Sequence, residues 1–215
     1  MITRDISRPT WAARPAVVIA SGPSLSDEQL EIVERAHMAE RVHAIAVNNT
    51  CERAPWADVA YFGDYTSIKH YRGANKGSKQ QDLASCCAEW WTISKPAAER
   101  WKLNHVASDN RPGFGVNRVS MNANSGAQAI NLAMLFGARR ILLLGFDMRD
   151  IGGRAHWFGQ HPKEWLVDVQ LYSEWIHKLT IAAPQAKARG VEILNCTPGS
   201  ALQCFDAKPL EEALA

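Results

Sequence analysis

The chain has 215 residues, of which 47% are hydrophobic and 21% charged, and its formal net charge at pH 7 is +2. This length allows one sizeable domain with a buried core, and the composition is that of an ordinary globular protein. So small a net charge gives no electrostatic reason to expect nucleic acid or an anionic membrane as the main partner. No apolar stretch approaches the roughly 20 residues of a membrane-spanning helix, and residues 1–15 lack the apolar core of a signal peptide.

The cysteine content predicts the cellular compartment of the protein. There are five, an odd number, and no two of them follow a Cys-x-x-Cys spacing. This usage is typical of reduced thiols packed in the core, so we expect a cytoplasmic protein.

Short apolar runs rich in β-branched residues recur along the chain and predict strands that are covered on both faces. They span residues 16–20, 42–47, 59–63, 89–94, 140–145 and 191–196. Helical patterns alternate with these runs. The alternation predicts an α/β fold with a single, mostly parallel sheet and helices on both faces.

Three helices are predicted between the strands. The first begins at the capping residue Ser26 and extends to residue 38; the second, over residues 124–138, is apolar around most of its circumference. The third carries an apolar stripe over residues 163–183 and is expected to break at Pro184.

The domain division is simple. We expect residues 1–215 to form one nucleotide-binding, transferase-like domain, with an N-terminal extension at residues 1–14. The polar, glycine-containing stretches 71–82 and 105–122 are predicted to be loops.

The first predicted strand ends in a Ser-Gly-Pro-Ser turn that contains Gly22, Pro23 and Ser24. Gly22 lets a ligand approach the backbone closely, Ser24 offers a hydroxyl, and the following helix offers free N–H groups that suit phosphate. A turn followed by a helix cap explains the same residues equally well. The stretch lacks the spacing of a dinucleotide-binding fingerprint or a P-loop.

Small polar residues also follow other strands or begin the second helix. These are Asn48, Asn49, Asp64, Asn124, Ser125, Gly126 and Asp147. Each taken singly fits a cap or a turn. Because the carboxyl ends of parallel strands meet at one edge of the sheet, we expect these residues to form a cleft with two anion-binding nests, suited to a nucleotide or its diphosphate.

Two histidines, His156 and His161, lie in a glycine-rich segment that should cross this edge. A histidine near neutral pH can take a proton from an acceptor hydroxyl, so either residue is a candidate general base. His161 equally fits a capping or packing role. With Asp147 and Asp150 the pair also forms an alternative metal set, although its spacing matches no strong metal motif.

The stretches "VVIASGPSL" and "NSGAQAINLAMLFGARRILLLGFDM", with an Asn after the second strand, resemble a Rossmann-like clan. It includes bacterial sialyltransferases, motility-accessory flagellin glycosyltransferases and archaeal-type 6-hydroxymethylpterin diphosphokinases. The closing "CTPGSAL" and "LEEAL" also resemble short phage or prophage proteins of unassigned function.

The resemblance to the sialyltransferases implies metal-independent transfer with a histidine as general base. It also implies that a cytidine nucleotide donor is held by Gly22, Pro23 and Ser24, by Asn48 or Asn49, and by Asn124, Ser125 and Gly126. Asp64 stands where the sialyltransferase pattern has Asn, which favours the other two branches. A carboxylate beside a diphosphate is repulsive unless a cation or a hydroxyl donor intervenes.

These observations predict a nucleotide-sugar-dependent glycosyltransferase that acts on a hydroxyl acceptor. His161 or His156 would activate the acceptor, while Asp64 would bind a hydroxyl group or a magnesium ion. The alternatives are a magnesium-dependent pyrophosphokinase and a non-catalytic phage accessory protein that keeps the fold. The sequence does not identify the sugar or the acceptor, leaves a homo-oligomer open, and implies the host cytoplasm if the protein is phage-encoded.

Overall fold

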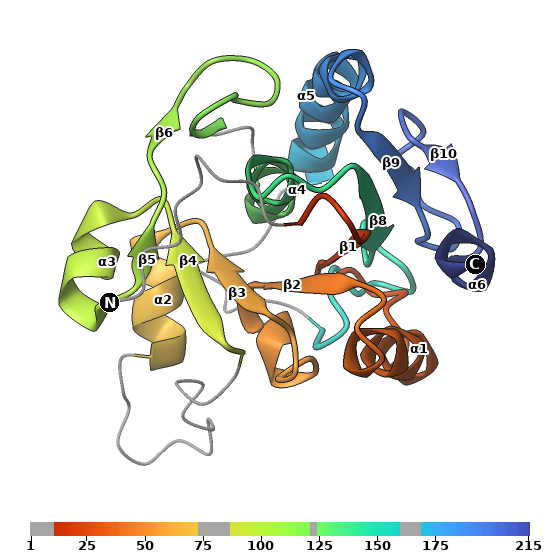
Figure 1. Cartoon of the computed structure of the whole chain (residues 1–215), viewed down its shortest axis with the longest axis horizontal. Helices are drawn as coiled ribbons and strands as arrows, with labels where there is room; N and C mark the ends of the chain where they lie inside the picture. Colours follow the sequence, from red (N-terminus) through yellow and green to blue (C-terminus); the bar gives the residue numbers. More distant parts are fainter. Residues whose placement is uncertain (1–10, 73–86, 121–123, 160–168) are drawn as a thin grey trace.

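The computed structural model describes residues 11–72, 87–120, 124–159 and 169–215, which form a parallel sheet with helices on both faces (Figure 1). The strand order is β10-β9-β8-β1-β2-β3-β4-β5. The strands are β1 (Ala16–Ile19), β2 (His43–Val47), β3 (Val59–Phe62), β4 (Glu89–Thr92), β5 (Asn104–His105), β8 (Arg140–Leu144), β9 (Glu192–Asn195) and β10 (Asp206–Ala207). All six predicted strands are present, and the predicted α/β fold is confirmed.

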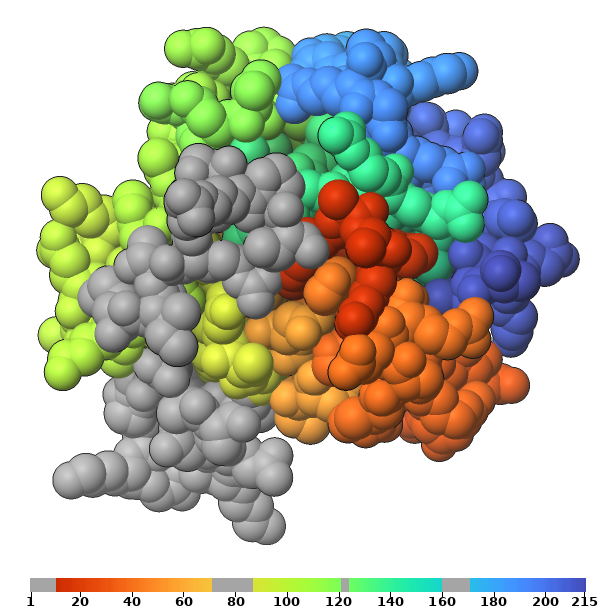
Figure 2. Space-filling view, viewed as in Figure 1, coloured from red at the N-terminus to blue at the C-terminus, as the bar shows by residue number. Residues whose placement is uncertain are grey.

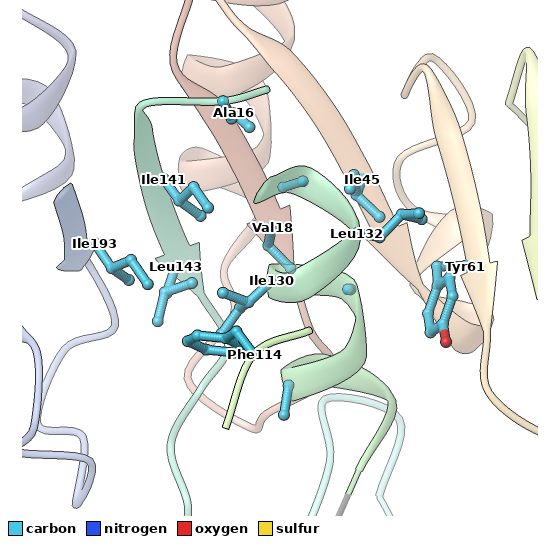
Figure 3. Packing of buried hydrophobic residues seen from close by; sticks show 14 of the residues in the cluster. Ala16, Val18, Ile45, Tyr61, Phe114, Ile130, Leu132, Ile141, Leu143 and Ile193 are labelled. Atoms are coloured by element: carbon cyan, nitrogen blue, oxygen red, sulfur yellow. The ribbon is translucent and has the colours of Figure 1, made fainter. Parts of the chain in front are cut away.

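The strands are buried because alternate side chains point to two separate apolar layers. Val18 of β1 faces the layer formed with α4 (Ser125–Leu135), where it lies near Ile130 (Figure 3). Leu179 of α5 (Val169–Ala188) belongs to the same layer. Val17 and Ile19 face the opposite layer. Each face of the sheet therefore has its own core, as the nearly continuous apolar runs predict.

Four helices cover the second face. They are α1 (Asp27–Met38), α2 (Tyr65–Arg72), α3 (Lys95–Trp101) and α6 (Leu210–Leu214). α1 begins where the sequence predicts, because the Ser26 hydroxyl accepts from the Gln29 amide and the Gln29 side chain accepts from the Ser26 amide. The Arg41 guanidinium donates to the carbonyl oxygen of Leu214, so the C-terminal residues (blue) lie beside α1 (Figures 1 and 2).

The predicted break at Pro184 is wrong. Pro184 lies inside α5, which continues to Ala188. A proline within a helix removes one backbone hydrogen bond and costs about 3 kcal/mol. The helix continues because Leu179, Ala182 and Ala186 on either side of the proline are buried in the core, and tertiary packing outweighs local propensity. The predicted start of this helix, at residue 163, lies outside the described residues.

The predicted loop over residues 105–122 is also partly wrong. It contains two short strands, β6 (Ser108–Asp109) and β7 (Val119–Ser120), which pair in parallel. Asn131 of α4 holds this segment in place, because its Oδ1 accepts from the amides of Gly115 and Ser120. Hydrogen bonds to a buried side-chain amide thus hold this segment, and it lacks the apolar run by which a strand is usually recognised in a sequence. Most of the predicted loop 71–82 and residues 1–10 of the N-terminal extension lie outside the described part of the chain.

The strand order reverses between β1 and β8. From β1 the chain proceeds outward through β2 to β5, and β8, β9 and β10 then extend the sheet in the other direction. In open α/β sheets, the loops that follow the two strands at such a reversal separate and leave a crevice for a ligand. Within the ranges that the structure describes, no helix is long and apolar enough to span a membrane.

Candidate functional site

A cavity of about 470 Å³ lies at the reversal point, beyond the carboxyl ends of β1, β2 and β8. This volume is in the range of small-molecule sites. Its wall includes eight residues that the sequence predicts for the site: Gly22, Asn48, Asp64, Asn124, Ser125, Gly126, Asp147 and His156. The structure therefore brings together residues from five separate segments, while their roles stay predictions.

The start of α4 forms one wall of the cavity. Asn124 caps this helix, because its Oδ1 accepts from the Ala127 amide at 2.8 Å. The amides of Ser125 and Gly126 precede the first intrahelical hydrogen bond and remain available to an anion, which the helix dipole also favours. A Cβ at Gly126 would lie 2.9 Å from Cε1 of Phe146, so glycine allows the helix to start directly against the β8 loop.

Asn48 follows β2 and holds a strained conformation. Its φ is +54°, in the left-handed region that few residues other than glycine adopt. Its Oδ1 is buried and has no hydrogen-bond partner in the described part of the chain. Strain combined with an unsatisfied polar atom costs stability, and such features gather at ligand sites.

Asp147 follows β8 and is only 2% exposed. Neither carboxylate oxygen makes a hydrogen bond to any described residue. Burial raises the pKa of Asp147 above its ordinary value; the nearby hydroxyl and amide of Ser24 and the charge of Arg149 lower it, but by less. Ser24 approaches the carboxylate without the geometry of a hydrogen bond, so burial dominates.

Three predicted residues do not line this cavity. Ser24 lines a separate cavity of about 610 Å³ between the start of α1 and the loop after β9, while Pro23 lines neither cavity. Asn49 is buried in η1 (Asn48–Glu52), the 3₁₀ turn after β2. The start of α1 is satisfied by its own capping box, so the first of the two predicted anion nests is reduced to Gly22.

Asp64 lies at the cavity rim but acts as a helix cap. Its Oδ1 accepts from the Ser67 amide and its Oδ2 from the Ser67 hydroxyl, both at 2.7 Å. Magnesium needs carboxylate oxygens free to coordinate it, whereas both oxygens of Asp64 accept from Ser67 and burial raises the pKa of Asp147, which disfavours its charged form. These two residues therefore do not fit a magnesium site. The described residues contain no group of three or more His, Cys, Asp and Glu side chains that could hold a metal ion.

His156 is fixed against the end of β1. Its Nδ1 shares a 3.0 Å hydrogen bond with the hydroxyl of Ser21, and its ring stacks on Phe158 with a centroid separation of 4.8 Å. The Trp157 amide donates to the carbonyl oxygen of Ser21, so the segment is anchored to β1 twice. The other candidate base, His161, lies outside the described residues.

The aromatic side of the cavity is formed by Tyr172 and Trp175 of α5, whose rings contact edge to face at 5.6 Å. The Tyr172 hydroxyl donates to Asp150, and burial together with this carboxylate raises its pKa. Such faces can stack a base or a sugar ring. Sequence reasoning missed Tyr172, because no periodicity tells which strand end a helix will cover. It also missed Ser21, although this residue belongs to the Ser-Gly-Pro-Ser turn.

The comparisons with known proteins concern the fold. No protein-family model matches the sequence, and no curated protein matches it. Among solved structures, the MAf glycosyltransferase from Magnetospirillum magneticum AMB-1 is similar over 94% of this chain, with a TM-score of 0.60 and 12% identity. The chain spans 34% of the length of that protein.

A short chain dehydrogenase from Mycobacterium smegmatis reaches a TM-score of only 0.28 at 12% identity, over 97% of this chain and 89% of that chain, which is too low to indicate a common fold. The likeness to the MAf glycosyltransferase shows the fold alone: the chain has a Rossmann-like α/β fold similar to part of that glycosyltransferase.

Proposed function

We propose that this chain binds a nucleotide sugar in the cavity at the β1–β8 reversal and transfers the sugar to a hydroxyl acceptor. The observation that carries the proposal is the lining of this cavity: it contains a helix start with available amides and two buried polar side chains, Asn48 and Asp147, with oxygens that have no hydrogen-bond partner among the described residues. Such groups are stabilised when a polar ligand supplies the missing partners. The glycosyltransferase of similar fold supports the class of reaction.

Each wall of the cavity has a separate role in the proposed sugar transfer. The phosphate lies at the start of α4, where the amides of Ser125 and Gly126 stabilise it as a leaving group, and Arg149 adds a positive charge elsewhere in the cavity wall. Tyr172 and Trp175 stack against a ring of the donor. The bond between the sugar and the phosphate oxygen breaks as the acceptor oxygen forms the new glycosidic bond.

His156 accepts the proton of the acceptor hydroxyl. Its bond to Ser21 and its stacking on Phe158 fix the ring at the cavity wall, as a general base requires. No metal takes part in this scheme, because Asp64 and Asp147 do not fit a magnesium site. For the same reason we do not favour the pyrophosphokinase.

The proposal is tested in two steps with a panel of nucleotides and nucleotide sugars. A ligand at 100 times its dissociation constant adds about 2.7 kcal/mol to the free energy of unfolding, so at least one panel member should raise the melting temperature of the wild-type chain. That donor should then be hydrolysed slowly to free nucleotide, with no loss of activity in the presence of a chelator.

Two histidine variants separate binding from transfer. His156→Ala should still bind the donor but hydrolyse it about 100-fold or more slowly, because a general base contributes about 10²–10⁴-fold. His105→Ala, which alters an exposed histidine on β5, should retain full activity. Binding without hydrolysis by the wild type would favour a non-catalytic binding protein, and binding of no panel member would refute the proposal.

A further inference from the structure

Two carboxylates of the chain differ in their partners. Asp58, which is partly buried just before β3, accepts from the Ala44 amide at 2.9 Å and lies 3.2 Å from Nε2 of His37 and 3.5 Å from Nδ1 of His43. Asp147 is more deeply buried at 2% exposure, yet neither of its oxygens makes a hydrogen bond to the described residues. A buried charged group without partners is destabilising, so a donor from outside the chain is the natural partner of Asp147.

The backbone around Asp147 is held firmly. The Thr197 hydroxyl accepts from the Phe146 amide, the Ser200 hydroxyl donates to the Phe146 carbonyl, and the Ala201 amide donates to the carbonyl of Asp147. These bonds fix the backbone that carries the Asp147 side chain. Among the described residues Ser24 approaches this carboxylate, but no hydrogen bond to either oxygen is formed.

The carboxylate also lies against the backbone of the first strand loop. A Cβ built on Gly22 would be 1.9 Å from Oδ2 of Asp147, so the absence of a side chain at Gly22 creates the space that the carboxylate occupies. Gly22 and Asp147 both line the cavity. The loop after β1 thus supplies the space at Gly22, and the loop after β8 supplies the hydrogen-bond acceptor Asp147, in the same part of the cavity wall.

We infer that Asp147 binds hydroxyl groups of the ligand, accepting hydrogen bonds from neighbouring hydroxyls of a sugar ring. This inference rests on the proposed function and names which part of the ligand lies near Gly22. Phosphate is excluded from this position by like-charge repulsion, so it lies at the start of α4 instead. The raised pKa of Asp147 agrees with a carboxyl group that lacks donors until a ligand arrives.

Hydroxyls of this kind occur both on the ribose and on the transferred sugar, and matched ligands distinguish the two. The probes are CMP, UMP, AMP and GMP, their 2′-deoxy and 3′-deoxy forms, the corresponding nucleotide sugars, and free ribose and glucose. Dissociation constants are measured by calorimetry for the wild type, Asp147→Ala and Asp147→Asn. Asp206→Asn, which removes an exposed carboxylate on β10, is the control.

We expect Asp147→Ala to bind about 10- to 100-fold more weakly, the range for a hydrogen bond to a charged group. Removal of the contacted hydroxyl should weaken wild-type binding by a similar factor and leave the affinity of Asp147→Ala unchanged. Loss with a deoxynucleotide places the ribose at Asp147. If Asp147→Ala weakens the binding of nucleotide sugars but not of the nucleotides alone, the transferred sugar lies at Asp147.

The melting temperatures of the ligand-free variants distinguish a role of Asp147 in ligand binding from a role in stabilising the fold. Asp147→Asn removes a desolvated charge, so it should melt at the same temperature as the wild type or higher while binding more weakly. A variant that loses stability and keeps its affinity would overturn the inference, as would equal discrimination against deoxy ligands by wild type and Asp147→Ala. Binding of a free sugar through Asp147 without binding of any nucleotide would support this inference and refute the proposed function.

Discussion

Replacement of Gly22 by alanine tests the packing of the two loops that form the site. The added Cβ would lie 1.9 Å from Oδ2 of Asp147 and 2.4 Å from the carbonyl oxygen of Gly145. The carbonyl cannot move freely, because it accepts the 2.9 Å hydrogen bond from the Gly22 amide that joins the two loops. The loops must therefore separate.

The cost follows from these two contacts. Overpacking a close-fitting site costs about 1–3 kcal/mol, and the strained interloop hydrogen bond adds about 1 kcal/mol. We expect Gly22→Ala to lower the free energy of unfolding by about 2–4 kcal/mol, which urea unfolding measures directly. In a chain of this size, each kcal/mol lowers the melting temperature by about 2–4 °C.

Gly190→Ala is the matched control. Gly190 has a φ of +69°, but no atom lies within 4 Å of the position that a Cβ would take, so alanine there costs only the left-handed backbone strain of about 1–2 kcal/mol. In the Gly22→Ala/Asp147→Ala double variant the contact at 1.9 Å disappears while the one at 2.4 Å persists, so part of the stability should return. Equal stability of Gly22→Ala and wild type would refute the close packing of these loops.

Two further predictions concern the support of the fold and of the site. Burial alone would raise the pKa of Asp58, but hydrogen bonds from His43 and the Ala44 amide and the charge of His37 lower it. Asp58→Asn should therefore cost about 1–3 kcal/mol at pH 7, and in urea unfolding this deficit should shrink as the pH falls below about 4, because Asp58 is protonated first in the unfolded chain and only at a still lower pH in the folded one. A deficit that is constant with pH would contradict the role of its charge. Thr197→Val should cost about 1–3 kcal/mol because it leaves the buried amide of Phe146 without an acceptor, whereas Thr197→Ser should be nearly neutral.

The sheet could be predicted from the sequence because its strands are buried on both faces. Each central strand is a nearly continuous apolar run, and this pattern can be recognised without knowing which strands pair with it. The short strands carry no such signal: β10 is two exposed residues, and Asn131 accepts hydrogen bonds from Ser120 of β7 and from Gly115 in the segment between β6 and β7. α5 passes through Pro184 because of tertiary burial, which local propensity does not contain.

The cavity wall could be predicted in part for a topological reason. All carboxyl ends of parallel strands lie at one edge, so polar residues that follow different strands converge there. Neighbouring residues point in different directions, and the sequence could not decide between them: Asn48 lines the cavity whereas Asn49 is buried in the 3₁₀ turn. The contribution of Tyr172 depends on how α5 packs, which only the assembled fold determines.

In the proposed function, a phosphate-bearing ligand occupies the cavity between β1, β8 and the start of α4. Amide chemical-shift mapping of the ¹⁵N-labelled chain, titrated with the panel member that most raises the melting temperature, tests it directly. We expect the largest shifts at the amides of Ser21, Asn48, Ser125, Gly126 and Asp147, with little change at the amides of α3. Shifts centred on the second cavity beside α1, or no shifts with any nucleotide or nucleotide sugar, would contradict it.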